Sequence, residues 1–358
     1  MSYQLPLGPF DQTWRGPLRI VLHADGERIS DVEHHDGFHA RGCAENLCRL
    51  PLQQSYPLVN RVCGIHSHHH ALAWTMALEQ LARIEVPARA ETLRALLAEA
   101  ERIASHLHDA ARMIALLGLD AVVQRLFRLR ELALQAGQTL AGHRLVYDFV
   151  RPGGVQYDLH RDERGALQTL LTTISDELQK IMPSILARRG LVRRMSRLAV
   201  LKPELLDSLH IAGWIGRAAG LDTDVRHDQP YGIYAVVRPP VVVRTAGDAR
   251  ARLATLLAEA HESAEFLRQI LLDLPEGRWR GDPLTAVPAG SATVSVEAPS
   301  GALTYRLTSD GAYLTEVNIT VWQRPDRRLL RAALVGTLVD DAGLAISSLA
   351  FCTACIEA

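Results

Sequence analysis

The sequence lacks a long apolar segment, an export signal and an excess of either charge. No stretch approaches the roughly 20 uninterrupted apolar residues that span a bilayer, and the start MSYQLPLGPFDQTW has no basic region followed by an apolar run. The 39 basic and 40 acidic side chains nearly cancel, so no net field would hold DNA or RNA. We therefore expect a soluble chain inside the cell that binds no nucleic acid.

Cysteine and aromatic residues are also scarce. Five cysteines, an odd number in a chain with no export signal, argue against a disulfide framework and for thiols that stay reduced or bind a metal. Aromatic residues make up only 5% of the chain, which fits helices packed through Ala and Leu.

Strand signals lie towards both ends of the chain. Residues 18–32, LRIVLHADGERISDV, place Asp25-Gly26 between two alternating runs, which is the strongest short-range signal for a β-hairpin. Residues 293–322 are rich in Thr, Val and Tyr and carry a second such turn at Asp310-Gly311. Residues 328–339 look helical.

The middle of the chain has the period of helices. After Pro87, apolar residues recur at helical spacing: Leu93, Leu96, Leu97, Ala100, Ile103, Leu107 and Ala110. Similar stripes run through residues 122–134, 167–186 and 253–271. These stripes predict a bundle of several long helices.

We therefore predict an α+β fold that is mainly α, with a central bundle of long helices and small β regions at both ends. The expected segments are an N-terminal β-rich part (1–60), the helical bundle (61–285), and a C-terminal β-rich part with a metal-site tail (286–358). They are expected to form one integrated domain.

Two short segments carry the residues best suited to chemistry. RVCGIHSHHH, residues 61–70, contains Cys63 and His66 in a Cys-x-x-His pair, and the terminal FCTACIEA contains Cys352 and Cys355 in a Cys-x-x-Cys pair. Each pair lets two donors bind one ion from a single turn, and two such pairs complete a tetrahedron or a bimetallic cradle. We predict one metal site shared by the two pairs. A structural zinc site is an open alternative.

The tract His68-His69-His70 has two interpretations. Its residues are either ligand candidates or solvent-facing polar residues at the start of a helix, and we do not expect all three to be ligands.

Several motifs together resemble a known family. RVCGIHSHHH followed by ALE resembles the signature Arg-x-Cys-Gly-x-Cys-x-x-x-His with Ala-x-Glu, found in the large subunit of membrane-bound, energy-converting (group 4) NiFe hydrogenases and related to the quinone-site subunit of respiratory complex I. Further matching segments follow in the family order: RIASHLHD, RPGGVQYDL, GRAAGLDTDVRHDQPYGIY, GDARARL, LPEG and EAPSG. The resemblance covers nearly the whole chain.

The resemblance implies a Ni-Fe centre between the bundle and the C-terminus. Cys63 and Cys352 would be terminal nickel thiolates, and Cys355 would bridge nickel and iron. The second bridging position falls on His66. A neutral imidazole nitrogen offers one lone pair to one metal, whereas a thiolate can bridge two, so His66 disfavours the ordinary Ni-Fe centre.

Other positions also depart from the family. Ser300 stands where the family has an arginine near the iron ligands, and Asp11 stands where complex I relatives have a histidine near quinone. Glu45 lies one residue off the register of the hydrogen-handling glutamate. Arg41 matches a position on the path to the iron–sulfur subunit, and His70 matches the signature histidine. By resemblance, Arg41, His70 and Glu45 are candidate catalytic residues, and Ser300 and Asp11 are candidate cofactor-binding positions.

Cys43 and Cys48 are extra to the family pattern. Most single intracellular cysteines are small core hydrophobes, and we expect that of both.

Three functions follow from the resemblance. The favoured one is a redox subunit of a membrane-associated multisubunit complex, which exchanges electrons with an iron–sulfur partner and passes them to quinone or another acceptor. The alternatives are a working NiFe hydrogenase and a non-catalytic scaffold with a zinc site. In each case the implied partners are a small iron–sulfur subunit and antiporter-like membrane subunits. The chain would be peripheral, on the cytoplasmic side of the cell membrane, with an exposed apolar face near the metal-site end.

Overall fold

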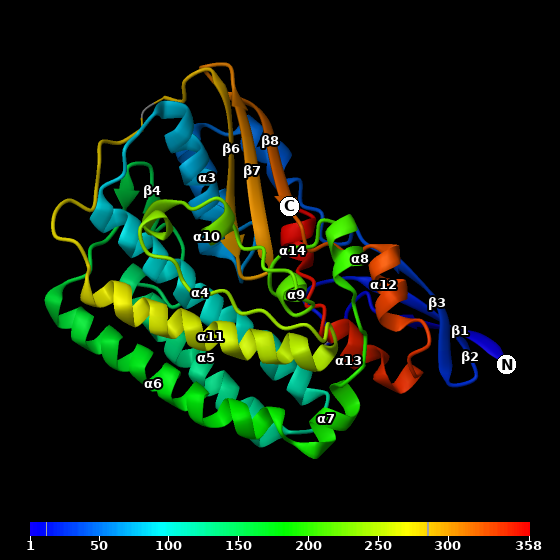
Figure 1. The fold of residues 1–358 in the computed structure, drawn as a ribbon. Helices are drawn as coiled ribbons and strands as arrows, with labels where there is room; N and C mark the ends of the chain where they lie inside the picture. Colours follow the sequence, from blue (N-terminus) through cyan, green and yellow to red (C-terminus); the bar gives the residue numbers. More distant parts are fainter. Residues whose placement is uncertain (12, 285) are drawn as a thin grey trace.

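The computed structural model describes residues 1–11, 13–284 and 286–358, and the chain begins with a three-stranded antiparallel sheet. Its strands β1 (Ser2–Leu7), β2 (Arg19–Asp25) and β3 (Arg28–His35) lie in sequence order. Asp25 pairs with Arg28, so the predicted hairpin at Asp25-Gly26 is confirmed. The sheet projects from one end of the molecule (Figure 1).

Three helices follow the first sheet: α1 (Cys43–Arg49), α2 (Leu52–Val59) and α3 (Ser67–Ala82). Helix α3 packs against the C-terminal sheet on one side and contacts α4 on another. The carboxylate of Glu101, from α4, accepts hydrogen bonds from the backbone amides of His68 and His69 at 2.9 and 3.2 Å. A carboxylate from a neighbouring helix therefore caps the positive end of α3.

Four long helices form the predicted bundle: α4 (Ala88–Ala115), α5 (Asp120–Ala141), α6 (Arg161–Leu186) and α11 (Ala249–Leu272). Helix α4 packs against α5 and α11, and both of these pack against α6. Local signals set the helix starts. Pro87 is the N-cap residue of α4. At the start of α11, the carboxylate of the N-cap residue Asp248 accepts a hydrogen bond from Ala251 N at 2.7 Å.

Short elements connect the long helices. They are β4 (Val150–Arg151), β5 (Gly154–Val155), α7 (Arg189–Met195), α8 (Pro203–Ser208), α9 (Trp214–Arg217), α10 (Val225–Asp228) and the 3-10 turn η1 (Gly232–Ala235).

The C-terminal part contains a second three-stranded antiparallel sheet, of β6 (Gly290–Ala298), β7 (Gly301–Ser309) and β8 (Leu314–Val321). The predicted turn at Asp310-Gly311 joins β7 to β8, and the Asp310 carboxylate accepts from Ala312 N and Tyr313 N, both at 2.8 Å. The chain ends in α12 (Arg327–Leu334), η2 (Val339–Asp341), α13 (Ala342–Ser347) and α14 (Thr353–Ile356).

The helix predicted over residues 328–339 is wrong at its C-terminal end, because α12 stops at Leu334. Gly336 adopts a left-handed φ of 84° and donates from its amide to Ile29 O at 2.8 Å. Val339 N then donates to Glu27 O at 2.9 Å. Hydrogen bonds to the first sheet thus replace those that would have continued the helix.

A buried ion network joins the bundle to the second sheet. Arg217 donates to Glu259 of α11 at 2.7 Å and to Glu297 of β6 at 2.9 Å, and Arg226 donates to Glu99 of α4 at 3.0 Å. All five side chains are almost fully buried, so each charge depends on its partners. The network holds the β6–β7 end against the helices.

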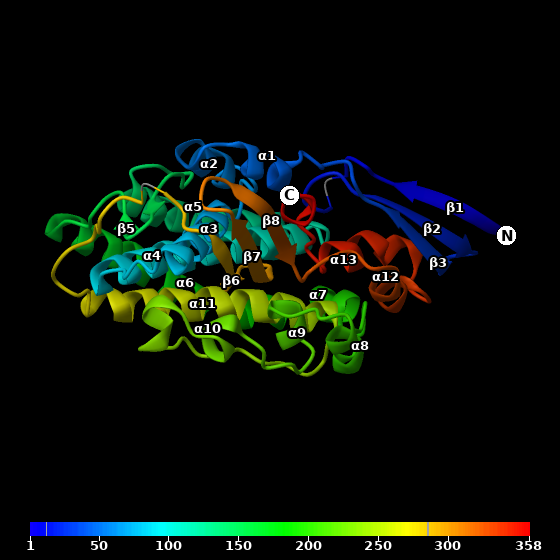
Figure 2. The ribbon, with the colours of Figure 1, turned by 90° about the horizontal axis from the view of Figure 1, so that it is seen from above.

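The two ends of the chain meet beside the second sheet. Arg15 forms a parallel bridge with Cys352, and a Cβ at Gly16 would collide with Thr353 Oγ1, so only glycine allows this approach. Both views place α14 between the second sheet and the first (Figures 1 and 2).

The observed architecture confirms the predicted fold class. The segment boundaries at residues 60 and 285 stay predictions, and residue 285 lies outside the described residues. None of the helices formed by the described residues is both long and apolar enough to cross a membrane.

Candidate metal centre

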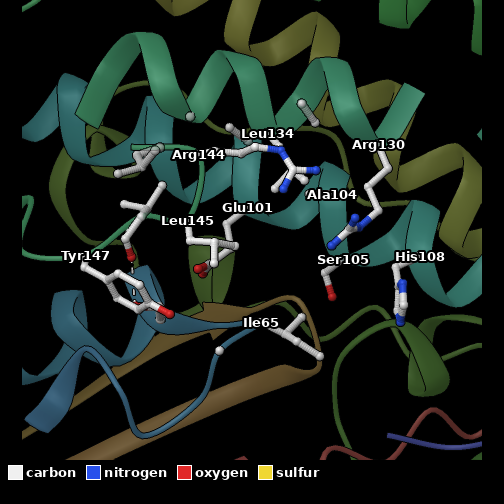
Figure 3. Close-up of a pocket in the computed structure, with 17 residues that line it drawn as sticks. Ile65, Glu101, Ala104, Ser105, His108, Arg130, Leu134, Arg144, Leu145 and Tyr147 are labelled. Atoms are coloured by element: carbon white, nitrogen blue, oxygen red, sulfur yellow. Dashed lines mark hydrogen bonds between the residues drawn. The ribbon is translucent and has the colours of Figure 1, made fainter. Parts of the chain in front are cut away.

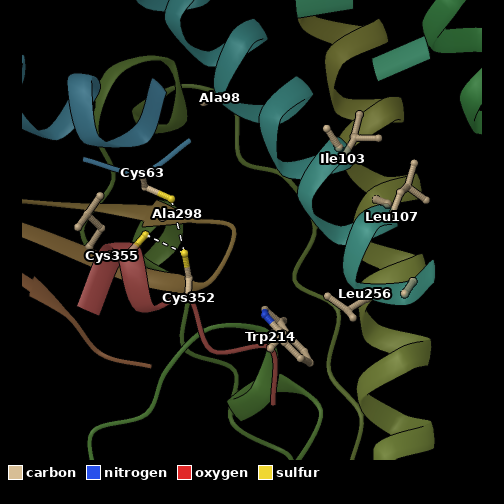
Figure 4. Close-up of a cluster of buried hydrophobic side chains, with 14 of the residues drawn as sticks. Cys63, Ala98, Ile103, Leu107, Trp214, Leu256, Ala298, Cys352 and Cys355 are labelled. Carbon is tan, nitrogen blue, oxygen red and sulfur yellow. Dashed lines mark hydrogen bonds between the residues drawn. The ribbon is translucent and has the colours of Figure 1, made fainter. Parts of the chain in front are cut away.

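The two motif segments meet in one buried cluster. The donor atoms of Cys63, His66, Cys352 and Cys355 all lie within 4.8 Å of one another, and all four residues are buried. Figure 4 shows the three cysteine side chains converging from the loop before α3 and from the C-terminal turn. We call these four residues the Cys/His cluster.

Backbone geometry presents each pair from a tight turn. His66 is the N-cap of α3, and the amides of Ile65 and His66 both point at Cys63 Sγ, at 3.4 Å. Cys352 is the N-cap of α14 and Cys355 lies within that helix. The two amides hold the Cys63 sulfur beside the start of α3.

The distances within the cluster suit one tetrahedral ion. Cys352 Sγ lies 3.5 Å from both Cys63 Sγ and Cys355 Sγ, and His66 Nδ1 lies 3.2 Å from Cys355 Sγ. Metal–sulfur bonds of about 2.3 Å in a tetrahedron hold two thiolates about 3.8 Å apart. Three thiols and one imidazole also form a standard donor set for a single zinc ion.

The same donors do not fit a Ni-Fe pair. Two bridging thiolates and two terminal ones require four sulfurs, and the cluster has three. His66 cannot supply the missing bridge, because Nδ1 faces Cys355 while Nε2 lies 3.2 Å from Ser105 Oγ and 3.4 Å from Arg15 Nη1. Ser300 lies buried in the β6–β7 turn and brings no cation to replace the family arginine.

A buried polar layer orients His66 from behind. Arg15 donates to Ser105 O at 3.0 Å and pairs with Asp109 at 2.7 Å, and all three residues are buried. A metal-bound imidazole holds its orientation by donating its other N–H, and Ser105 Oγ is placed to accept it.

His70 lies on the other side of the cluster. Its Nε2 is 3.4 Å from Cys355 Sγ and its Nδ1 is 2.8 Å from the Tyr305 hydroxyl. Burial, and then the nearby charge of His66, lowers the pKa of His70 to about 3. His70 is therefore neutral at pH 7 and contacts a cluster thiol.

Two donors of the cluster, His66 and Cys352, have shifted pKa values. Burial opposes a charge on His66, but the thiols of Cys63 and Cys352 raise its pKa to about 10. Hydrogen bonds from Cys355 and Cys63 hold the pKa of Cys352 well below its usual range. A cation among these donors would displace the proton from His66, so binding releases protons.

Arg41 connects the two motif segments. Its guanidinium donates to Arg61 O at 3.1 Å, to Val62 O, and to Ala354 O at 3.5 Å. The Arg41 guanidinium therefore hydrogen-bonds backbone carbonyls just before Cys63 and just before Cys355.

The other predicted positions lie outside the cluster. Glu45 is exposed on the first turn of α1, and Asp11 is partly exposed and accepts from Thr13 N at 2.8 Å. Cys43 is buried and Cys48 is partly buried, and burial raises the pKa of both thiols.

The solvent-facing interpretation of the histidine tract is wrong. His68, His69 and His70 are all buried. His69 Nδ1 hydrogen-bonds the Glu101 carboxylate, and His68 Nε2 lies 2.9 Å from Arg94 O. The Glu101 carboxylate holds the tract against α4.

Sequence reasoning did not single out Arg15, Asp109 or Tyr305. Arg15 lies in a loop without periodicity, and Tyr305 has the pattern of an ordinary strand residue. Asp109 carried the better signal, because it follows Ser105 by four residues and thus lies on the same face of α4.

Comparisons with protein families and known proteins match most of the chain. Residues 47–122 match the model of the nickel-dependent hydrogenase family, and residues 117–285 match that of the respiratory-chain NADH dehydrogenase 49 kDa subunit. The carbon monoxide-induced hydrogenase of Rhodospirillum rubrum is 29% identical, over 99% of each chain. Formate hydrogenlyase subunit 5 of Escherichia coli is 29% identical, over 99% of this chain and 62% of that protein.

Two further comparisons identify the family. A chain in the solved archaeal membrane-bound sulfane sulfur reductase, a respiratory membrane complex, superposes with a TM-score of 0.92 at 25% identity, covering 100% of this chain and 98% of that one. A subunit of the NADH-quinone oxidoreductase of Dehalococcoides mccartyi is 34% identical over 87% of this chain and 85% of that protein. The chain therefore belongs to the family that unites the large subunits of nickel-dependent hydrogenases with the 49 kDa subunit of respiratory-chain NADH dehydrogenase.

Proposed function

We propose that this chain is a redox subunit of a membrane-associated multisubunit complex, which exchanges electrons with an iron–sulfur partner subunit at or near the Cys/His cluster. The observation that carries the proposal is the convergence of Cys63, His66, Cys352 and Cys355 into one buried group. Family membership supports it, because the similar proteins are hydrogenases, a quinone oxidoreductase subunit and part of a respiratory membrane complex.

The Cys/His cluster is proposed to hold one ion, with zinc favoured by the donor set. Four protein donors close the coordination shell and leave no position for a substrate. The ion would fasten the C-terminal tail to the start of α3. Electrons would then pass near the cluster, between the partner's iron–sulfur clusters and an acceptor such as a quinone.

The proposed site of assembly is the cluster end of the molecule, on the cytoplasmic side of the membrane. Phe38 is 50% exposed, and its neighbour His39 lies 3.1 Å from Thr353 Oγ1 through Nδ1; Phe10, five residues before Arg15, is 88% exposed. Exposed aromatic side chains beside a buried site suit a protein partner. Antiporter-like subunits would supply the membrane attachment.

Elemental analysis of the complex from its native host tests the single-ion proposal, because maturation factors are present there. We expect about one zinc per chain and no nickel. Nickel and iron in equal amounts, after subtraction of iron–sulfur iron, would overturn it in favour of a working hydrogenase.

Copurification tests the assembly. A tag on this chain is expected to recover an iron–sulfur subunit and membrane subunits after mild detergent extraction. If the tagged chain were recovered in good yield without any other subunit, this would contradict its role in a complex.

A further inference from the structure

A cavity of about 110 Å³ lies between α4, α5 and the loop before α3, next to the Cys/His cluster but separate from its four donors. Its walls on the two helices are mainly apolar. They include Ala100 and Ala104 from α4 and Ala133 and Leu134 from α5. A concave, mainly apolar space with a few polar groups is the usual form of a small-molecule site.

Polar side chains gather at one end of this cavity. Figure 3 shows Arg130 extending from α5 towards Ser105 of α4, with His108 one turn further along α4. Buried atoms Arg130 Nε and His108 Nδ1 have no hydrogen-bond partner among the described residues. Two nitrogen atoms on side chains that line the cavity are therefore buried without a protein partner.

Arg130 carries the charge that the cavity leaves unbalanced. The second arginine on the cavity wall, Arg144, is neutralised, because its Nε donates to Glu131 at 2.8 Å. Burial, and then the charges of Arg144 and Arg15, lowers the pKa of Arg130. Arg130 is partly buried and forms no ion pair among the described residues, so a bound anion would offset part of the cost of its burial.

His108 complements such an anion without adding charge. Burial, and then Arg15 and Arg112, lowers its pKa to about 3, so its ring is neutral and can donate one N–H. Ser105 adds a hydroxyl. Glu101 also lines the cavity and disfavours a second negative charge on the occupant.

We propose that this cavity binds a small monocarboxylate, with its carboxylate on Arg130, His108 and Ser105 and its short apolar part against Ala104 and Ala133. The planar guanidinium matches a carboxylate in shape and charge. Ser105 Oγ lies 3.2 Å from His66 Nε2, so the ligand is separated from the cluster by one hydrogen-bonded residue.

Isothermal titration calorimetry with acetate at constant ionic strength tests the site. We expect one saturable site in the purified protein and at least about tenfold weaker binding in Arg130→Gln, because a charge-assisted pair is lost. Arg128→Gln removes the same charge from the exposed face of the same helix and is expected to bind as the wild type does. Equal affinities in folded Arg130→Gln and wild type, or no saturation in the wild type, would overturn the proposal.

A second variant and a larger ligand keep the test decisive if Arg130→Gln does not fold. Ala104→Leu fills the apolar half while it retains Arg130, and it is expected to lose acetate binding. Benzoate has a larger apolar part than acetate and is expected to bind more weakly, because the walls at Ala104 and Ala133 leave less room for it. Acetate binding by folded Ala104→Leu, or benzoate binding as tight as that of acetate, would place the anion on the surface instead.

Discussion

The Sγ atoms of Cys63 and Cys352 lie 3.5 Å apart, although 289 positions separate the two residues in the chain. This separation is far longer than the roughly 2.05 Å bond of a disulfide and close to the about 3.8 Å between two thiolates on one tetrahedral ion. The start of α3 and the C-terminal tail are thus two halves of one site. Loss of either thiol is expected to act on both halves.

Cys352→Ala is expected to abolish stoichiometric metal binding, because three donors remain and the tail loses its hold on the ion. Elemental analysis of the purified variant measures this. Cys48→Ala is the matched control, since Cys48 is a partly buried cysteine outside the cluster. An unchanged metal content in Cys352→Ala would refute the shared site.

His66→Cys is expected to retain one ion per chain, now held by four thiolates. Absorption by the cobalt-substituted protein checks this, because thiolate-to-cobalt bands grow with the number of sulfur donors. His66→Ala is the companion variant and is expected to bind more weakly than the wild type. If His66→Ala bound cobalt with wild-type affinity, His66 would not be a ligand.

Arg41→Gln is expected to weaken metal binding about tenfold, as is typical when a residue that orients the ligands is lost. The reason is that Arg41 bonds carbonyls in both ligand segments, at Val62 and Ala354. Competition with a chromophoric chelator gives the affinity. Arg49→Gln, at the exposed end of α1, is expected to leave it unchanged.

Asp109→Asn is expected to lower the free energy of unfolding by about 3–5 kcal/mol, because it leaves the buried guanidinium of Arg15 without a counter-charge. The double variant with Arg15→Gln should lose less than the sum of the single variants. Chemical denaturation of all four proteins measures this coupling. If the losses in the free energy of unfolding were strictly additive, the Arg15–Asp109 pair would not contribute to stability.

The free energy of unfolding is expected to fall as the solution is acidified below about pH 6.5. Burial lowers the pKa of His106 to about 4, although the hydrogen bond to Glu259 raises it in part. Burial also lowers the pKa of His108, to about 3. In this window the unfolded chain binds more protons than the folded one. Stability therefore drops by up to about 1.4 kcal/mol per pH unit for each histidine.

Denaturation across this pH range checks that slope. His106→Gln is expected to reduce it, whereas His143→Gln, which alters an exposed histidine, should leave it unchanged. Equal slopes in wild type and His106→Gln would contradict the assignment.

Local patterns account for the parts of the fold that the sequence predicted. The Asp25-Gly26 hairpin and the stripe that begins after Pro87 depend on backbone preferences and on a helical period within single segments. The end of α12 was mispredicted because Gly336 and Val339 bond residues of the first sheet, some 300 positions away along the chain. Gly336 was the local signal for this end, and the distant hydrogen bonds decided it.

For the Cys/His cluster too, one part follows from the sequence and another only from tertiary packing. The sequence by itself determined which donors exist, and that Cys63 and His66 share one turn and Cys352 and Cys355 another; the family resemblance added that His66 stands at the position expected of a bridging thiolate. The sequence did so for each pair because residues three apart in a turn are neighbours whatever surrounds them. Tertiary packing alone decided that the turns meet, that Arg15 stands behind His66, and that a cavity opens beside Ser105. These contacts join segments whose approach depends on how helices, sheets and the tail pack together, and that packing is a property of the whole chain.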